Sequence, residues 1–370
     1  MRFIQEELFG RAMWVAPETE GIKYAGSKLK LIPYILELVS DLNIQTVLDG
    51  FSGTTRVSQA FAKLGFNVIS NDIAEWSEVF GKCYLLNPHP KEYYKPLIEH
   101  LNSLTGYDGW FTEHYGGELG KDIKKPFQRK NTRKCDAVRD EIERLGLNDI
   151  EKSVALKSLI LALDAVDNTL GHHASYLSRW SERSYHDLCL KVPMVFISKG
   201  LNKVFKQDIF ETVRQCEVDL AYFDPPYGSN NDKMPPRRIR YASYYHIWTS
   251  VIKTDKPKVF GKVNRREDTR DSIATSVFEE FRKDESGKFI ALQAIQRLIE
   301  ETNARYILLS YSSGGRATKE ELFEILTSSG KLLKTVEIEY KQNVMSGMRW
   351  TNEWVNTTDK HCEYLFLIEK

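Results

Sequence analysis

The tetrapeptide Asp224-Pro225-Pro226-Tyr227 places a carboxylate, two rigid residues and an aromatic ring side by side. It follows the apolar run Val218 to Phe223, which predicts a buried strand. Two consecutive prolines cannot continue a central strand, so they stiffen the loop that leaves it. Open α/β sheets bind ligands beyond the carboxyl ends of their strands. We therefore expect a site at this loop, although the tetrapeptide alone would equally suit a proline-rich surface turn.

The chemistry that suits this loop is methylation of an exocyclic amine. Such an amine has two N–H donors, which the Asp224 carboxylate and a proline carbonyl could accept together while Tyr227 stacks on the base. The amino lone pair of adenine is delocalised into its ring. Orienting both N–H groups toward acceptors would help that nitrogen to attack a positively charged methylsulfonium in line. The expected catalytic residues are Asp224, Pro225, Pro226 and Tyr227.

A glycine corner and an acidic strand end accompany this loop. Asp49-Gly50-Phe51-Ser52-Gly53 closes a strand predicted over Thr46 to Asp49 and precedes a helix predicted over Arg56 to Leu64. At a corner of this kind a ligand can approach the backbone closely. Asp72 follows the next predicted strand, where an acidic residue can bind a ribose hydroxyl. The alternative for Asp72 is a solvated side chain at a strand end.

With Lys23-Tyr24-Ala25-Gly26-Ser27-Lys28, these motifs resemble the D12-class (alpha-group) DNA adenine N6-methyltransferases, which include bacterial DNA adenine methylases and restriction-modification methylases. In that group the lysine motif comes first, the glycine motif second, the target-recognition region next, and Asp-Pro-Pro-Tyr after it. This chain has the same order. The resemblance covers about residues 21–80 and 200–230 and, more loosely, 300–370. It implies S-adenosyl-L-methionine as the cofactor.

The resemblance also assigns residues to cofactor binding. It implies Tyr24, Gly26 and Lys28 at the methionine end, Asp49, Phe51 and Gly53 in the main cradle, Asp72 at the ribose hydroxyls and Asp208 at the cofactor adenine. The chain departs from the family pattern twice, with Ser27 and Thr55 where glycine is common. Both changes replace a small residue by a small one, so they bear on cofactor affinity more than on activity.

Strand-like runs alternate with helical periodicity, which predicts an α/β fold with a mainly parallel sheet. The resemblance implies a Rossmann-like S-adenosylmethionine-dependent methyltransferase core with a late antiparallel strand. We expect a discontinuous catalytic core over residues 21–80, 194–230 and 288–370. An inserted, largely helical target-recognition lobe is expected over 81–193, and a second, DNA-contacting insertion over 231–287.

Individual elements follow from the same periodicity. The predicted helices cover Leu29 to Leu42, Ser153 to Ala165, Ala291 to Thr302 and Lys319 to Ser328. The predicted strands cover Asn67 to Ser70, Met194 to Ile197, Asn202 to Phe205, Arg305 to Ser310, Leu332 to Tyr340 and Tyr364 to Ile368. Gly106 to Gly120, the basic run after it and residues 228–287 read as irregular.

Local charge favours a nucleic-acid partner, although 52 Lys and Arg balance 51 Asp and Glu overall. Basic residues gather between Lys121 and Arg139, and Pro235 to Tyr245 interleaves Arg with Tyr, which suits phosphate contact and stacking on displaced bases. A target adenine in duplex DNA must leave the base stack to react, so base flipping is expected. The expected DNA-binding residues are Lys124, Lys125, Arg129, Lys130, Arg133, Arg237, Arg238, Arg240 and Tyr244. The alternative is a solvated basic surface with the tyrosines packed on the core.

Other classes of protein fit less well. Transfer to the N4 amine of cytosine is the second interpretation, although such families more often begin the catalytic motif with serine. RNA or protein methylation would favour Asn at position 224, and a catalytically silent DNA-binding relative would be expected to have lost one of Lys28, Asp72, Asp208 and Asp224. The glycines suit neither a P-loop nor a nicotinamide fingerprint.

Composition bounds the setting. Hydrophobic residues make up 42% of the chain, and its five scattered cysteines include no C-x-x-C pair, so we expect a globular protein without disulfide framework or metal. His172, His173 and His246 read as core or surface residues. No apolar stretch suits a bilayer span, and a cytoplasmic location is the default expectation. The expected partners are double-stranded DNA and, by the resemblance, a cognate restriction endonuclease.

Overall fold

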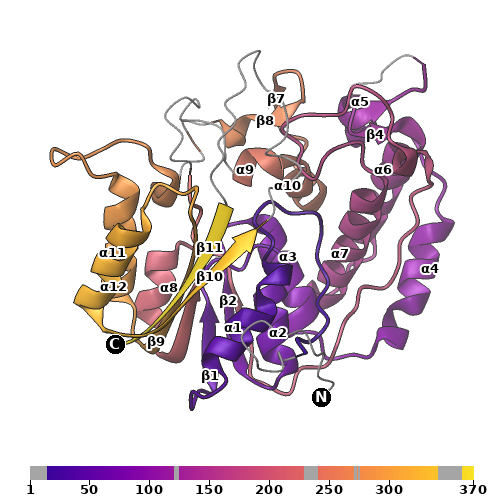
Figure 1. Ribbon diagram of the computed structural model, residues 1–370. Coiled ribbons are helices and arrows are strands. Elements are labelled where there is room, and N and C mark those ends of the chain that lie inside the picture. The colour runs from indigo at the N-terminus through magenta and orange to yellow at the C-terminus, as the bar shows by residue number, and fades with distance from the viewer. Residues whose placement is uncertain (1–14, 121–124, 229–240, 271–272, 274–275, 341–360) are drawn as a thin grey trace. The chain divides into compact units, whose positions relative to one another are not determined.

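The computed structural model describes residues 15–120, 125–228, 241–270, 273, 276–340 and 361–370 (Figure 1). The chain forms two compact units, each assembled from separate stretches of sequence. Unit 1 comprises Met1–Glu37, Ser52–Asp208 and Tyr241–Ala274, and unit 2 comprises Leu38–Phe51, Ile209–Arg240 and Thr275–Lys370. Each unit is described below by itself.

Unit 2 is built on a sheet. Its described strands are β1 (Thr46–Asp49), β6 (Val218–Phe223), β9 (Ala304–Ser312), β10 (Lys331–Tyr340) and β11 (His361–Glu369), in the spatial order β10-β11-β9-β6-β1. β1, β6 and β9 pair in parallel, whereas β11 is antiparallel to both β9 and β10. The last strand in sequence therefore lies between two earlier ones (Figure 1). The predicted late antiparallel strand is confirmed.

The central strands of unit 2 are apolar because both of their faces are covered. Leu220 and Ala221 on β6, which point to opposite faces, are fully buried, as are Leu308 and Leu309 on β9. The helices are α8 (Ile209–Gln215), α11 (Ile290–Glu301) and α12 (Lys319–Ser329). α8 packs against α11, and α11 packs against α12. A capping box at Thr318 and Glu321 begins α12, so this boundary is set by local sequence.

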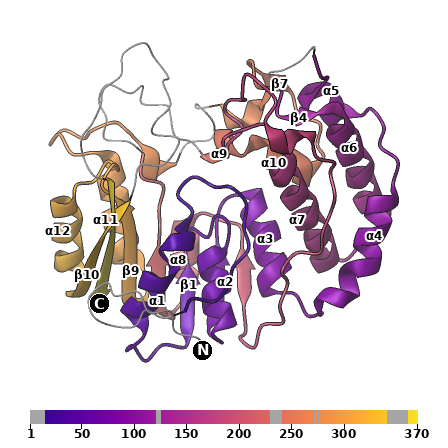
Figure 2. The same ribbon diagram turned by 45° about the vertical axis from the view of Figure 1, so that its right-hand side comes forward.

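Unit 1 joins a parallel strand pair to a helical lobe. The pair is β2 (Asn67–Asn71) and β5 (Lys203–Phe205). The helices are α2 (Arg56–Lys63), α3 (Glu75–Leu85), α4 (Lys95–Ser103), α5 (Trp110–Tyr115), α6 (Arg129–Arg144), α7 (Asp149–Val166), α9 (Tyr241–Tyr244) and α10 (His246–Lys253). α7 packs against α3 on one side and against α6 on the other (Figure 2). Side chains from these helices, among them Phe80, Leu159 and Trp248, form one core. The mixed α/β fold and the largely helical lobe agree with expectation.

The remaining elements are short. They are α1 (Ile32–Val39), the 3-10 turns at Lys28–Lys30, Lys91–Tyr94, Glu182–Tyr185, Glu267–Thr269 and Val277–Glu279, and the two-residue strands β3 (Gly116–Gly117), β4 (Phe127–Gln128), β7 (Val259–Phe260) and β8 (Arg265–Arg266). Among the helices that the structure describes, none combines the length with the apolar character that a bilayer crossing requires.

Some sequence expectations were wrong. The strand expected over Met194 to Ile197 does not form, because the Met194 N–H donates to Glu20 and the Val195 N–H to the Pro193 carbonyl instead of to a sheet. The helix expected from Leu29 begins only at Ile32, after a 3-10 turn.

The stretches read as irregular contain helices. Gly106 to Gly120 holds α5, the basic run continues into α6, and α10 lies within residues 228–287. Buried Asp136 on α6 accepts N–H bonds from Phe111 and Thr112, so it caps α5 from 24 or more residues away. The sequence close to α5 gives no sign of this contact, because the capping residue lies on another helix.

Candidate active site

The segment that carries Tyr24 is held by two later tyrosines of unit 1. The Tyr24 ring stacks on Tyr245 at 4.5 Å and on Tyr241 at 5.4 Å between ring centroids. The Ala25 N–H donates to the Tyr245 hydroxyl at 2.7 Å. Burial, and secondarily the charge of Asp72, raises the pKa of Tyr24 well above its usual value. Tyr24 is therefore a neutral ring clamped in one orientation.

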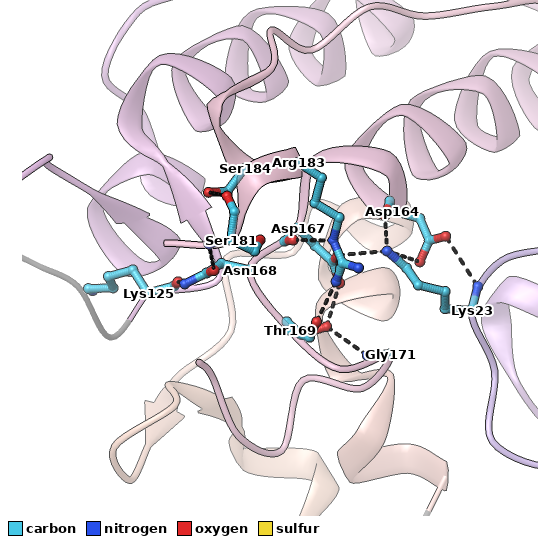
Figure 3. Close-up of polar contacts among 10 residues, drawn as sticks. All are labelled: Lys23, Lys125, Asp164, Asp167, Asn168, Thr169, Gly171, Ser181, Arg183 and Ser184. Carbon is cyan, nitrogen blue, oxygen red and sulfur yellow. Dashed lines mark hydrogen bonds and ion pairs between the residues drawn. The ribbon is translucent and has the colours of Figure 1, made fainter. Parts of the chain in front are cut away.

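Lys23 anchors the same segment to the carboxyl end of α7 (Figure 3). Its ammonium lies 2.7 Å from Asp167 and also donates to the Asp164 carbonyl, while its backbone N–H donates to the Asp164 carboxylate at 3.1 Å. Arg183 pairs with Asp167 at 2.7 Å. Figure 3 shows Lys23 and Arg183 both directed at Asp167. Burial raises the pKa of Asp164 to about 6, with the charge of Lys23 opposing the rise.

The glycine corner of unit 1 is organised by Asp72. The Gly53 N–H donates to Oδ2 of Asp72 at 2.8 Å, and the Ala74 N–H donates to Oδ1 at 3.0 Å. Burial raises the pKa of Asp72, and these N–H bonds oppose the rise. Gly53 has φ +49°, and a Cβ there would lie 3.3 Å from the Tyr24 ring. The corner thus brings three predicted cofactor residues, Tyr24, Gly53 and Asp72, together.

Thr55 occupies the position where the family pattern commonly has glycine. It adopts φ +62°, a left-handed conformation that favours glycine and is uncommon for a β-branched residue. It is fully buried, its hydroxyl donates to the Thr54 carbonyl, and its backbone carbonyl accepts the Gln59 N–H in the first turn of α2. The substitution therefore keeps the backbone geometry of the corner.

Phe51, the residue of the glycine motif at which this stretch of unit 2 ends, belongs to an aromatic cluster. Phe51 meets Phe278 edge to face at 5.2 Å, and Phe210 stacks on Phe278 at 5.8 Å. Asp49 at the end of β1 is buried. A Cβ on Gly50 would lie 2.7 Å from the Phe223 ring, so this glycine is required for packing. Phe278 and Phe210 are buried, whereas Phe51 is partly exposed.

The Asp224-Pro225-Pro226-Tyr227 loop follows β6 directly, as expected. The Tyr227 hydroxyl contacts the Asp224 carboxylate and lies 2.6 Å from Oε1 of Glu363 on β11. Its ring packs on Tyr311 at 4.7 Å, and the Arg316 N–H donates to its carbonyl at 3.0 Å. Burial and the two carboxylates raise the pKa of Tyr227 well above its usual value, so the phenol keeps its proton.

The other expected cofactor residues lie in varied surroundings. Lys28 is buried in the 3-10 turn that follows the first motif. Gly26 is exposed, has φ +76° and faces the Tyr241 hydroxyl, which a Cβ would approach to 3.1 Å. Asp208 is exposed and is the last residue of Ser52–Asp208, the stretch of unit 1 that contains β5.

The expected DNA-binding residues are only partly described. Lys124, Arg237, Arg238 and Arg240 lie outside the described residues. Arg129 and Arg133 pair with Asp108 at 2.9 and 3.4 Å, and Lys130 pairs with Asp187 at 2.5 Å. The ammonium of Lys125 donates to the His114 carbonyl, and Tyr244 stacks on His172 at 4.6 Å. A phosphate at α6 would therefore compete with carboxylates.

The structure adds two residues that sequence reasoning did not single out, because Glu363 and Phe278 each contact an expected site residue. Tyr245, which belongs to the stretch expected to contact DNA, is buried and stacks on Tyr24. A signal existed for Glu363, an acidic residue directly before the apolar run Tyr364 to Ile368. His173 and His246 are buried in the unit 1 core. In the described part of the chain, no three His, Cys, Asp or Glu side chains are grouped as metal ligands would be.

Comparison with known proteins identifies relatives. A family model described as D12 class N6 adenine-specific DNA methyltransferase matches residues 24–325. Modification methylase StsI of Streptococcus sanguinis is 30% identical over 82% of this chain and 46% of its own length. The type II methyltransferases M.FokI of Planomicrobium okeanokoites and M.NlaIII of Neisseria lactamica are 28% and 25% identical over 94% of this chain. The chain thus spans about half of StsI and M.FokI, at 46% and 53%, and 99% of M.NlaIII.

Proposed function

The chain belongs to the D12 class of N6 adenine-specific DNA methyltransferases, and from this premise we propose that it transfers a methyl group from S-adenosyl-L-methionine to the N6 amine of adenine at a specific site in duplex DNA. The observation that carries the proposal is the Asp224-Pro225-Pro226-Tyr227 loop, which begins where β6 ends. Parallel strands present their ligands at this end.

The catalytic loop would hold the target base. The Asp224 carboxylate and the Pro225 carbonyl each accept one N–H of the adenine amine, which turns the nitrogen lone pair toward the methyl donor. Pro226 keeps the loop rigid, and Tyr227 supplies an aromatic surface. Once N6 carries the methyl group, the nitrogen must release one proton. Asp224, which already accepts a hydrogen bond from this amine, would take that proton.

S-adenosylmethionine would supply a methyl group on a positively charged sulfur. Tyr24, Gly26 and Lys28 would bind its methionine end, and Asp49, Phe51 and Gly53 its main body. The Asp72 carboxylate, which accepts the Gly53 and Ala74 N–H groups, would also bind a ribose hydroxyl. Asp208 would meet the cofactor adenine, while the partly exposed ring of Phe51 offers apolar surface for a planar ring. The residues present fit the group.

DNA would be bound by the basic residues named from the sequence, with the adenine flipped out of the duplex. The division into a catalytic core over 21–80, 194–230 and 288–370, a recognition lobe over 81–193 and an insertion over 231–287 belongs to this proposal. The chain would act in the cytoplasm within a restriction-modification system, alongside an endonuclease of the same site. Its relatives, which are named as modification methylases and type II methyltransferases, support this role.

The test is transfer of labelled methyl from S-adenosylmethionine to unmethylated genomic DNA, followed by nucleoside analysis. N6-methyladenine is the expected product. Detection of N4-methylcytosine would mean that the substrate is cytosine and not adenine. Absence of label from DNA would overturn the proposal. Asp224→Ala serves as the catalytic control in the same assay.

A further inference from the structure

Glu363 is a buried carboxylate that the catalytic motif does not include. It lies on β11, opposite Ser312 of β9, and is 8% exposed. It also lies beyond residues 24–325, the part of the chain that the family model matches. A buried carboxylate is costly unless hydrogen bonds compensate for its lost hydration, so its contacts carry information.

Two hydroxyl groups contact the same oxygen of Glu363. The Ser310 hydroxyl on β9 donates to Oε1 at 2.9 Å, and the Tyr227 hydroxyl lies 2.6 Å from it. The Tyr227 hydroxyl also contacts the Asp224 carboxylate. Glu363 and Asp224 are thus linked through one phenol.

A phenol has a single proton, so Tyr227 cannot donate to both carboxylates at once. Glu363 and Asp224 therefore compete for one donor. The position of Glu363 sets where the Tyr227 hydroxyl lies and how much of its hydrogen bond reaches Asp224. The backbone carbonyl of Tyr227 is held separately by the Arg316 N–H, so the contacts of the hydroxyl with Glu363 and Asp224 are distinct from those that fix the backbone.

We propose that Glu363 is a positioning residue for methyl transfer, acting through the Tyr227 hydroxyl to hold the Asp224 carboxylate in the orientation that accepts the substrate amine. The inference rests on the proposed function of the loop and adds to it a residue from the last strand. Glu363 itself touches no reacting atom.

The test compares Glu363→Ala with Glu363→Gln in the full chain, by kcat and by KM for S-adenosylmethionine and for DNA. Glu363→Ala should lower kcat about 10- to 100-fold with both KM values within about twofold, because misplacement of a reacting group affects the transition state. Glu363→Gln should keep most of kcat, since its amide retains the shape and an acceptor oxygen. Glu337→Ala on β10, an exposed residue paired with Lys319, is the matched control and should change neither constant.

The Tyr227→Phe background separates positioning from general stability. Glu363→Ala should lower kcat no further there, because its route to Asp224 has been removed. An equal fall in both backgrounds, or a Glu363→Ala enzyme within about twofold of wild-type kcat, would overturn the inference.

Urea unfolding of wild type, Glu363→Ala, Tyr227→Phe and the double variant tests the Glu363–Tyr227 link without any substrate. Non-additive effects of the two substitutions support the Glu363–Tyr227 link, and additive effects overturn it. A wild-type protein that transfers no methyl group to DNA would overturn the proposed function instead, and the unfolding measurements would still decide whether the link exists.

Discussion

The backbone N–H of Gly53 donates a hydrogen bond of 2.8 Å to Oδ2 of Asp72. Two motifs that are 19 residues apart are thereby joined, because the acidic residue after β2 holds the glycine corner in place. The same carboxylate is proposed to bind a ribose hydroxyl. Asp72 would then both hold the backbone of the cofactor site in place and contact the cofactor itself.

Asp72→Asn tests this double role. The amide keeps the size of the side chain but replaces one acceptor oxygen by a donor, which leaves Gly53 or Ala74 without its N–H acceptor. Affinity for S-adenosylmethionine, measured by calorimetry, should fall at least about tenfold, or about 1.4 kcal/mol. Asp41→Asn, at an exposed site of unit 2, is the control. An Asp72→Asn protein that binds the cofactor as tightly as wild type would contradict this role.

Asp224→Ala should abolish methyl transfer while leaving cofactor affinity within about threefold, because the carboxylate is proposed to contact the substrate amine and not the cofactor. Transfer is measured with labelled S-adenosylmethionine and affinity by calorimetry. If transfer persists in this variant, Asp224 has no part in the mechanism. If both transfer and binding are lost, Asp224 has a structural role as well.

Lys157→Met should stabilise the protein at neutral pH. Lys157 is fully buried over the Phe80 ring, and its ammonium has no hydrogen-bond partner among the described residues. Burial lowers its pKa from 10.5 to about 8, so the charged form is held at a cost. The gain in unfolding free energy should be about 3 kcal/mol at pH 7.

The pH dependence of that gain follows from the sign of the shift. The folded protein binds this proton less tightly than the unfolded chain, so wild-type stability should rise between about pH 8 and pH 10.5. The advantage of Lys157→Met should shrink over the same window in urea unfolding. A constant advantage would show that packing, and not charge, is responsible.

Asp164 should make the free energy of unfolding fall, and not rise, as the pH increases in the acidic range. Its pKa is raised by burial from 3.8 to about 6, so the folded protein binds the proton more tightly than the unfolded chain. The resulting stabilisation, about 3 kcal/mol, is present in full below about pH 3.8 and is lost as pH rises through about 6. In Asp164→Asn, urea unfolding should lack this component. An unchanged pH profile would remove Asp164 as its source.

Asp108→Asn should strengthen DNA binding. Asp108 pairs with Arg129 and Arg133, so its removal frees Arg133 from this carboxylate and leaves Arg129 paired with Glu118 alone. Affinity at low salt should rise severalfold, and the slope of log K against log salt should steepen by about 0.9 for each phosphate newly contacted. Asp149→Asn, on an exposed carboxylate near Lys82, is the control. Equal affinities for Asp108→Asn and wild type would mean that this face of α6 does not contact DNA.

The sequence by itself determined the elements and motifs whose signals are local. Strands β1 and β6 were predicted with their observed bounds, because an apolar run between turn residues depends on near neighbours. The order of the lysine, glycine and Asp-Pro-Pro-Tyr motifs was enough to indicate the family that the comparison shows. These features need no knowledge of which distant segments meet.

Only the tertiary structure decided the contacts between distant segments. The hydroxyl of Tyr227 meets Glu363, 136 residues later, because β11 inserts between β9 and β10. Tyr24 meets Tyr245 because the chain between α9 and α10 returns to the first motif, and α5 forms where Asp136 on a later helix accepts its free N–H groups. Each contact depends on packing that buries side chains from separate stretches together, and neither periodicity nor local propensity encodes that choice of partner.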